Sequence, residues 1–299
     1  MSLVSPPVDD DGKYEDYESL FEDGLWLLSR ENGERNEQKA FKILKKTADK
    51  AKFPESYLMI AVMYEYGIGI KKNIKSAIKY YKLAATHDII CAQRHLGYMY
   101  LYGIGIEKDL KEALDWLEEA AINGDAVALY DVGAMYVNGI EVEVDYQRAA
   151  EYFFDALNYQ HPQANFNLGC MYYNGHGVNQ DFIKAKKYFK RAGELGEYKG
   201  YTYLGHLFYY GKGTPLDDRK ALKYYTLAAL KKEPEALLAL STIYREGEIV
   251  EKDDFLAEKY AKDTKENGLN KRSSVHNIDI RHVSCGERRL NVFLELLFS

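Results

Sequence analysis

The sequence predicts an all-α protein in which helix-turn-helix units stack into an elongated α/α superhelical solenoid. Three observations support this fold class. The chain copies itself at a fixed interval of 36 residues, apolar residues inside each copy lie at helical spacing, and a glycine-rich segment separates two helical stretches. Two helices that share one apolar face cannot bury it alone, so consecutive units must stack. No stretch shows the alternating pattern of a strand.

The repeat is defined by columns that recur through six consecutive units without an insertion. A small residue recurs at Ala61, Gly97, Gly133, Gly169, Gly205 and Ser241. Three positions further on, an aromatic residue recurs as Tyr64, Tyr100, Tyr136, Tyr172, Phe208 and Tyr244. A glycine then recurs at Gly67, Gly103, Gly139, Gly175, Gly211 and Gly247. An asparagine or aspartate follows at Asn73, Asp109, Asp145, Asp181, Asp217 and Asp253.

Each column has a structural reason. The small residue lies on the buried face of the first helix and allows a neighbouring helix to approach closely. The first helix should end at the Gly103 type of glycine, which adopts the left-handed C-cap conformation at no steric cost. The second helix should start after the Asp109 type of residue, whose carboxylate accepts from the first free amides. Pro162 and Pro234 are placed to open first helices.

The columns divide the chain into four segments. We expect an acidic tail over residues 1–18, a degenerate first repeat over 19–53, six repeats over 54–268 and a separate segment over 269–299. The degenerate repeat keeps Gly24 and Ala40 at the separation that Gly97 and Ala113 show. Up to Asp23 the chain carries eight acids against one base, which is typical of a solvated tail leading into a first helix.

These columns resemble the Sel-1-like repeat family, a relative of the tetratricopeptide repeats. A tetratricopeptide unit has 34 residues, whereas this chain has a longer period and the doubled glycine of YGIGIEKD and NGHGVNQD. The resemblance covers about residues 54–265 and departs from the pattern where Glu141 and Ile249 replace the second glycine. It implies a non-catalytic adaptor or scaffold that binds a protein or peptide. A cysteine-rich subset of the family is described as binding or hydrolysing β-lactams, but three cysteines cannot supply its paired thiols.

Composition narrows the function further. A formal net charge of −6 gives no global reason to bind nucleic acid, so we expect no such partner. We predict no transmembrane segment, because no stretch reaches the roughly 18 to 20 apolar residues of a spanning helix. The absence of a signal-like start and of a disulfide framework favours a reducing, cytoplasmic location. The 27 tyrosines indicate half-buried rings or a tyrosine-lined surface.

No motif for catalysis or for a cofactor is evident. The glycine loops lack the GxxxxGK[ST] order of a phosphate-binding loop. Cys91 and His95 are four residues apart, but a zinc site needs three or four ligands. Cys170 and His206 share one column, yet a Cys–His nucleophile needs a third residue to orient it. We therefore predict no catalytic, cofactor-binding or metal-binding residue.

The best candidates for function lie in four columns of the first helix that the repeat does not prescribe. Helical periodicity places them together on one arc outside the buried face. In the second to fifth of the six regular repeats this arc is rich in tyrosine, histidine and asparagine, which is typical of protein-binding surfaces. We call the predicted binding residues the first-helix stripe: His95, Tyr98, Tyr102, Asp131, Asn138, Asn167, Asn174, Tyr203, His206 and Tyr210.

Several alternatives stay open at this point. Some stripe tyrosines could fill space between neighbouring first helices. We expect the partner to bind in the groove that the first helices of the repeats form, but this groove could instead serve a ligand-binding protein or an enzyme. The C-terminal segment carries Arg288 and Arg289 before an apolar run over 290–298. That run could cap the open end of the array, dock on a partner, or give a membrane-associated adaptor a peripheral contact with the bilayer.

Overall fold

The structure is a computed structural model that describes residues 16–29, 36–247 and 249–267. Within these ranges every regular element is helical and no strand occurs. Residues 1–15 of the predicted acidic tail and the C-terminal segment, with Arg288, Arg289 and residues 290–298, lie outside the described residues. The described part of that tail consists of Asp16, which caps the first helix, and of Tyr17 and Glu18 in its first turn. No helix in the described part of the chain is long and apolar enough to cross a membrane.

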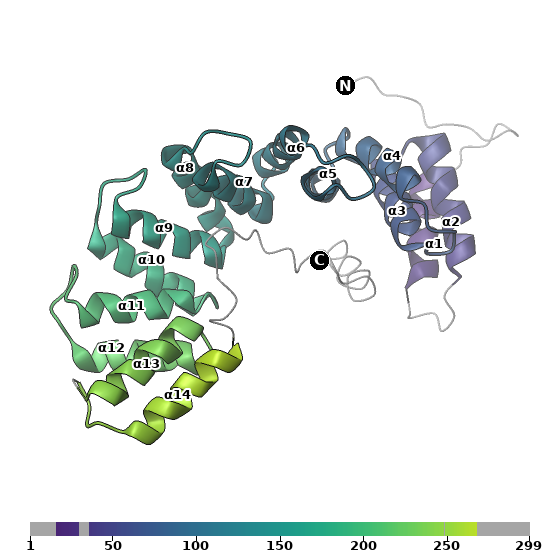
Figure 1. Cartoon of the computed structure of the whole chain (residues 1–299). Helices are drawn as coiled ribbons and strands as arrows, with labels where there is room; N and C mark the ends of the chain where they lie inside the picture. The colour runs from purple at the N-terminus through teal and green to yellow at the C-terminus, as the bar shows by residue number, and fades with distance from the viewer. Residues whose placement is uncertain (1–15, 30–35, 248, 268–299) are drawn as a thin grey trace, which may run out of the picture. The chain divides into compact units, whose positions relative to one another are not determined.

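The helices alternate between the first and the second helix of successive repeats, so odd labels mark first helices and even labels second helices (Figure 1). The first helices are α1 (Tyr17–Leu28), α3 (Pro54–Tyr66), α5 (Ile90–Tyr102), α7 (Ala126–Asn138), α9 (Pro162–Asn174), α11 (Lys199–Tyr209) and α13 (Pro234–Glu246). The second helices are α2 (Glu37–Lys46), α4 (Ile74–Ala85), α6 (Leu110–Ile122), α8 (Tyr146–Ala156), α10 (Phe182–Glu194), α12 (Asp218–Ala229) and α14 (Asp254–Asn267). Short π and 3-10 turns, η2 (Thr47–Ala51) and η3 (Leu157–Tyr159), extend α2 and α8.

The described residues fall into two compact units. One contains α1 to α6 and ends at Asp125, and the other contains α7 to α14 and begins at Ala126. Within each unit the first and second helices of a repeat pack on each other and the second helix packs on the next first helix. Figure 1 shows α9 to α14 as such a stack of helix pairs.

The small-residue column sets the distance between the two helices of a repeat. A Cβ atom added to Gly97 would lie 2.8 Å from Leu117, and one added to Gly169 would lie 2.5 Å from the ring of Phe189. Gly205 faces Tyr225 at 2.6 Å in the same way. The prediction that a small residue permits close approach is confirmed, because a large buried side chain of the second helix fills the space above the glycine.

The glycine loops have the predicted conformation. The glycine that follows the first helix has a positive φ in all six regular repeats, between +64° at Gly139 and +75° at Gly175. The second glycine is required by a contact as well, since a Cβ on Gly177 would collide with the carbonyl oxygen of Tyr146 in the preceding repeat. Where Glu141 replaces that glycine, the backbone keeps φ at +60°. The loop geometry is therefore preserved at the expense of a left-handed non-glycine residue.

The second helices begin at the predicted caps. Side-chain oxygens accept a hydrogen bond from the backbone three residues on at Asn73, Asp109, Asp145, Asp181, Asp217 and Asp253. Each bond satisfies one of the amides that a helix start leaves without an intrahelical partner. Pro54, Pro162 and Pro234 open first helices, where a missing amide hydrogen costs nothing.

Much of the tyrosine excess forms stacked ring pairs inside the repeats. The aromatic column of the first helix stacks on an aromatic residue of the second helix at 5.6 to 5.9 Å between centroids. The stacked pairs are Tyr64–Tyr80, Tyr136–Tyr152, Tyr172–Tyr188, Phe208–Tyr224 and Tyr244–Tyr260. Basic side chains cover several of these rings, as Lys184 covers Tyr172 at 5.0 Å.

Candidate protein-binding surface

The first-helix stripe is present on both units, and each part is described by itself. In the first unit it lies on α5, where His95, Tyr98 and Tyr102 are half-buried and Cys91 is exposed. The rings of Tyr98 and Tyr102 lie 6.2 Å apart on successive turns of the helix. This part of the stripe therefore presents a short aromatic face.

His95 belongs to a hydrogen-bonded group that reaches into the core. Its Nε2 lies 3.0 Å from Glu65 Oε2, and the buried Tyr81 hydroxyl donates to the same oxygen at 2.6 Å. Burial alone would raise the pKa of Glu65, but the bonds from His95 and Tyr81 together with the charges of His95 and Lys72 hold that pKa below its ordinary value. The group fixes the His95 ring against the helix pair of the preceding repeat.

On α7 the stripe is largely covered. Asp131 is only 3% exposed, and Ala134 beside it is buried as well. Asn138 is half-buried and its Nδ2 donates to the carbonyl of Ala134 at 2.8 Å. The open arc that periodicity assigned to this helix is therefore absent in its middle, and Asp131 does not present its carboxylate to solvent.

On α9 the two stripe asparagines offer hydrogen-bonding groups. Asn167 is half-buried, and its side-chain amide has no hydrogen-bond partner among the described residues. Asn174 is exposed and donates through Nδ2 to the carbonyl of Cys170 at 3.0 Å, which leaves its Oδ1 open. Amide groups of this kind can pair with the backbone of an extended peptide.

On α11 the aromatic residues divide into a packed and an open group. Tyr203 contacts Phe166 and Phe189, with ring centroids at 5.3 and 5.1 Å, so it fills space between neighbouring helices. His206 is half-buried and its Nδ1 lies 2.7 Å from the hydroxyl of the core residue Tyr225. Tyr210 follows at the end of the helix and is 62% exposed.

Burial shifts the pKa values of several titratable side chains in and around the stripe on α9 and α11. Burial raises the pKa of the Cys170 thiol to about 12 and also raises the pKa of Tyr203 and Tyr225. Burial, with the nearby charge of Lys212, lowers the pKa of His206. At neutral pH Cys170 is a protonated thiol, which speaks against its use as a nucleophile with His206.

The residue types that bind metals do not gather in the described part of the chain. No group of three or more histidine, cysteine, aspartate or glutamate side chains comes together there in a way that could hold a metal ion. The recurring aspartates cap helices, and the glycine loops close the turns between helices.

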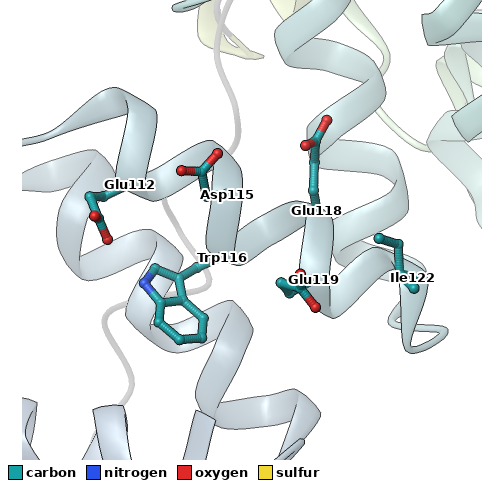
Figure 2. Close-up of a pocket in the computed structure, with 6 residues that line it drawn as sticks. All are labelled: Glu112, Asp115, Trp116, Glu118, Glu119 and Ile122. Carbon is teal, nitrogen blue, oxygen red and sulfur yellow. The ribbon is translucent and has the colours of Figure 1, made fainter. Parts of the chain in front are cut away.

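A second surface feature lies on α6 and was missed by the sequence analysis. An open hollow of about 320 Å³ follows the outer face of this helix. Figure 2 shows the six side chains that line it, all from α6: Glu112, Asp115, Trp116, Glu118, Glu119 and Ile122. Ile122 is 75% exposed at the end of this hollow, beside the four carboxylates that line it. The sequence carried a signal for this face, because the column of Glu112 holds a basic residue in each of the next three repeats, at Arg148, Lys184 and Lys220.

The repeated helix pairs, their glycine loops and their aspartate caps define the class of α/α solenoid repeat proteins. The Sel1 repeat profile matches seven segments, at residues 18–51, 54–88, 92–125, 126–154, 162–197, 199–232 and 234–262. The chain therefore belongs to the Sel1 repeat family. Proteins of this family are generally non-catalytic scaffolds for protein interactions.

Solved structures agree with this assignment. The chain is similar to c5321, a protective antigen of uropathogenic Escherichia coli strains with the same repeat fold, at a TM-score of 0.77 and 26% identity. The match covers 84% of this chain and 54% of the antigen, so the chain spans about half the length of that relative. A Sel1 repeat protein from Oxalobacter formigenes matches at a TM-score of 0.67 and 30% identity, over 83% of this chain and 100% of its own. A comparison with curated proteins gave no match.

Proposed function

We propose that this protein is a non-catalytic scaffold that binds a protein or peptide partner through the first-helix stripe. The observation that supports the proposal most directly is the combination on α9 and α11 of open amides with an exposed ring. Asn167 and Asn174 retain hydrogen-bonding capacity among the described residues, and Tyr210 at the end of α11 is 62% exposed. Such a mixture of aromatic anchors and adaptable polar groups is typical of surfaces that bind polypeptides.

The stripe residues have different roles in this proposal. Tyr98, Tyr102 and Tyr210 are the aromatic anchors, because their rings are at least partly open. Asn138, Asn167 and Asn174 supply amide contacts. Tyr203, His95 and His206 position the surface through their packing and hydrogen bonds. Asp131 lies beneath the binding surface and does not contact the partner directly, since its side chain is buried.

We also propose a reducing compartment such as the cytoplasm as the place where the scaffold works. The free thiols of Cys91 and Cys170 support this location, because an oxidising compartment would expose the accessible thiol of Cys91 to oxidation.

The test is a pull-down with the intact chain, followed by binding measurements with the partner that it returns. Tyr102→Ala combined with Tyr210→Ala should weaken binding by about 2 kcal/mol or more, because interface energy concentrates in a few aromatic anchors. Tyr159→Ala is the matched control, since Tyr159 is 51% exposed but lies on η3 outside the stripe. Unchanged binding by a normally folded double variant would remove the stripe as the binding site.

A further inference from the structure

Two second helices carry opposite charges at four matching columns of the repeat. Helix α6 has four acids against one base, and α10 has five bases against one acid. Counting two repeats of 36 residues from one helix to the other pairs each α6 acid with an α10 base. The pairs are Glu112 with Lys184, Asp115 with Lys187, Glu118 with Lys190 and Glu119 with Arg191. The two helices therefore carry charges at the same four columns of the repeat, negative on α6 and positive on α10.

Seven of these eight side chains are exposed, and Glu118 is half-buried. Glu112, Asp115 and Glu119 are exposed on α6. The four bases on α10 are exposed too: Lys184, Lys187, Lys190 and Arg191. We call these two surfaces the α6 acidic face (Glu112, Asp115, Glu118, Glu119) and the α10 basic face (Lys184, Lys187, Lys190, Arg191).

The α10 basic face is little neutralised within its own unit. Glu194 lies 3.6 Å from Lys190 and 3.5 Å from Arg191, and all three side chains are at least 40% exposed, so these pairs are weak. Among the described residues no carboxylate lies within ion-pair distance of Lys184 or Lys187. The positive charge of this face is thus available to a partner.

We propose that the α6 acidic face of one copy of this protein docks on the α10 basic face of a second copy. Charge complementarity identifies the occupant: each face offers four charges at the columns where the other offers their opposites. The faces also share helix geometry, so the spacing of charges along one axis matches the spacing along the other. A complementary arrangement of this kind fixes the register of a contact and suppresses other partners.

We favour an antiparallel arrangement of the two helices, which places the first and last charges of each face opposite charges of the other sign. Seven residues separate Glu112 from Glu119 and Lys184 from Arg191, so Glu112 lies opposite Arg191 when Glu119 lies opposite Lys184. Antiparallel helices also align their dipoles favourably. The same register brings the exposed Ile122 near Ile183, which is 67% exposed on α10. The hollow beside Trp116 gives the incoming side chains room.

The contact uses the second helices, whereas the proposed partner site uses the first helices, so either idea can fail without the other. Because the two faces differ, copies join as a closed pair that uses both faces of each or as a head-to-tail row. Sedimentation velocity distinguishes these forms. The attraction between exposed charges is screened by salt, so association should be strong at about 20 mM salt and lost near 500 mM.

The decisive experiment reverses each face separately in the full chain. The acid-reversed variant carries Glu112→Lys, Asp115→Lys, Glu118→Lys and Glu119→Lys. The base-reversed variant carries Lys184→Glu, Lys187→Glu, Lys190→Glu and Arg191→Glu. Each variant alone should lose self-association by at least about tenfold in Kd, which is about 1.4 kcal/mol, because like charges then face each other. An equimolar mixture of the two should associate again, because opposite charges face each other across the mixed contact.

Control variants separate a local effect from a general effect of charge. The control is a double variant on α4, with Lys79→Glu and Lys82→Glu, which alters the same two repeat columns as Lys187 and Lys190. This variant should associate like wild type. If a fourfold variant melts below the wild-type temperature, the experiment can be repeated with two double variants. One double variant carries Asp115→Lys and Glu118→Lys, and the other carries Lys187→Glu and Lys190→Glu. A wild-type chain that stays monomeric at low salt overturns the proposal. So does a folded reversed variant that associates like wild type, or a mixture that fails to associate.

Discussion

At the scale of single residues, polar atoms inside the repeats are paired across neighbouring helices. The buried tyrosines of the second helices show this clearly, since Tyr81 bonds Glu65 and Tyr225 bonds His206. In the repeats between them the same column holds Leu117, Phe153 and Phe189, which need no partner. A hydroxyl in this column therefore requires a matching acceptor on a first helix, because an unpaired buried hydroxyl would be costly.

The His206–Tyr225 pair predicts a dependence of stability on pH. In the His206 tautomer that carries its proton on Nε2, Nδ1 accepts from the Tyr225 hydroxyl, and protonation of the ring removes that acceptor. Burial lowers the His206 pKa in the folded protein, so below the unfolded value of about 6.5 the unfolded chain binds more protons and stability falls. Urea unfolding between about pH 5 and 7 should show this loss in wild type. His206→Gln, which keeps an acceptor, should flatten the profile; an equally steep profile would contradict the assignment.

At the scale of elements, the contact between the two helices of a repeat depends on a glycine and a large side chain. Phe189 sits over Gly169 as Phe153 sits over Gly133, and a Cβ atom added to either glycine would lie 2.5 or 2.6 Å from the ring. The helix pairs are held together by these contacts and by the stacked rings beside them. Close packing of this kind tolerates little added volume.

Replacing Gly169 with alanine tests this packing, because the two contributions to the change in the free energy of unfolding have opposite signs. Helix propensity alone would favour alanine by about 1 kcal/mol, whereas overpacking against Phe189 costs about 1 to 3 kcal/mol. Because the added Cβ would lie 2.5 Å from the ring, we expect overpacking to outweigh helix propensity, with a net loss of up to about 2 kcal/mol in the free energy of unfolding. Gln163→Ala on the exposed face of α9 is the control. An increase in stability for Gly169→Ala would show that α9 and α10 are free to separate.

At the scale of the whole molecule, the contacts are local along the chain. In the second unit each helix packs mainly on its neighbours in sequence, as α9 does on α10 and α10 on α11. Stability in such an array is approximately a sum of repeat terms and nearest-neighbour interfaces. Destabilisation should therefore spread outward from the altered repeat and weaken with distance.

Hydrogen exchange in the Gly169→Ala variant can measure that spread. Amide exchange should accelerate most in α9 and α10, less in the adjoining helices α8 and α11, and least in α13 and α14. The comparison is with wild type under the same conditions. A uniform acceleration from α7 to α14 would instead mean that the second unit opens as one cooperative block.

Local features of the repeat could be predicted from sequence because they depend on neighbours in the chain. The helix ends at Gly103, the caps such as Asp109 and the prolines at helix starts follow from backbone conformation and nearby hydrogen bonds. The period itself predicted the stacked architecture, since each unit has the same apolar face to bury. The charge inversion between α6 and α10 was also present in the columns, but only their exposure gave it meaning.

The amino-acid sequence by itself determined the repeat, the helices and the class of protein, whereas the tertiary structure decided which stripe residues are open. Periodicity treats Asp131, Tyr203 and Tyr210 alike, yet the first is buried, the second packs among rings and the third is 62% exposed. Helical spacing fixes the direction of a side chain from its own axis. Whether that side chain is buried depends on which side chains of neighbouring helices pack against it, and only the tertiary structure shows this.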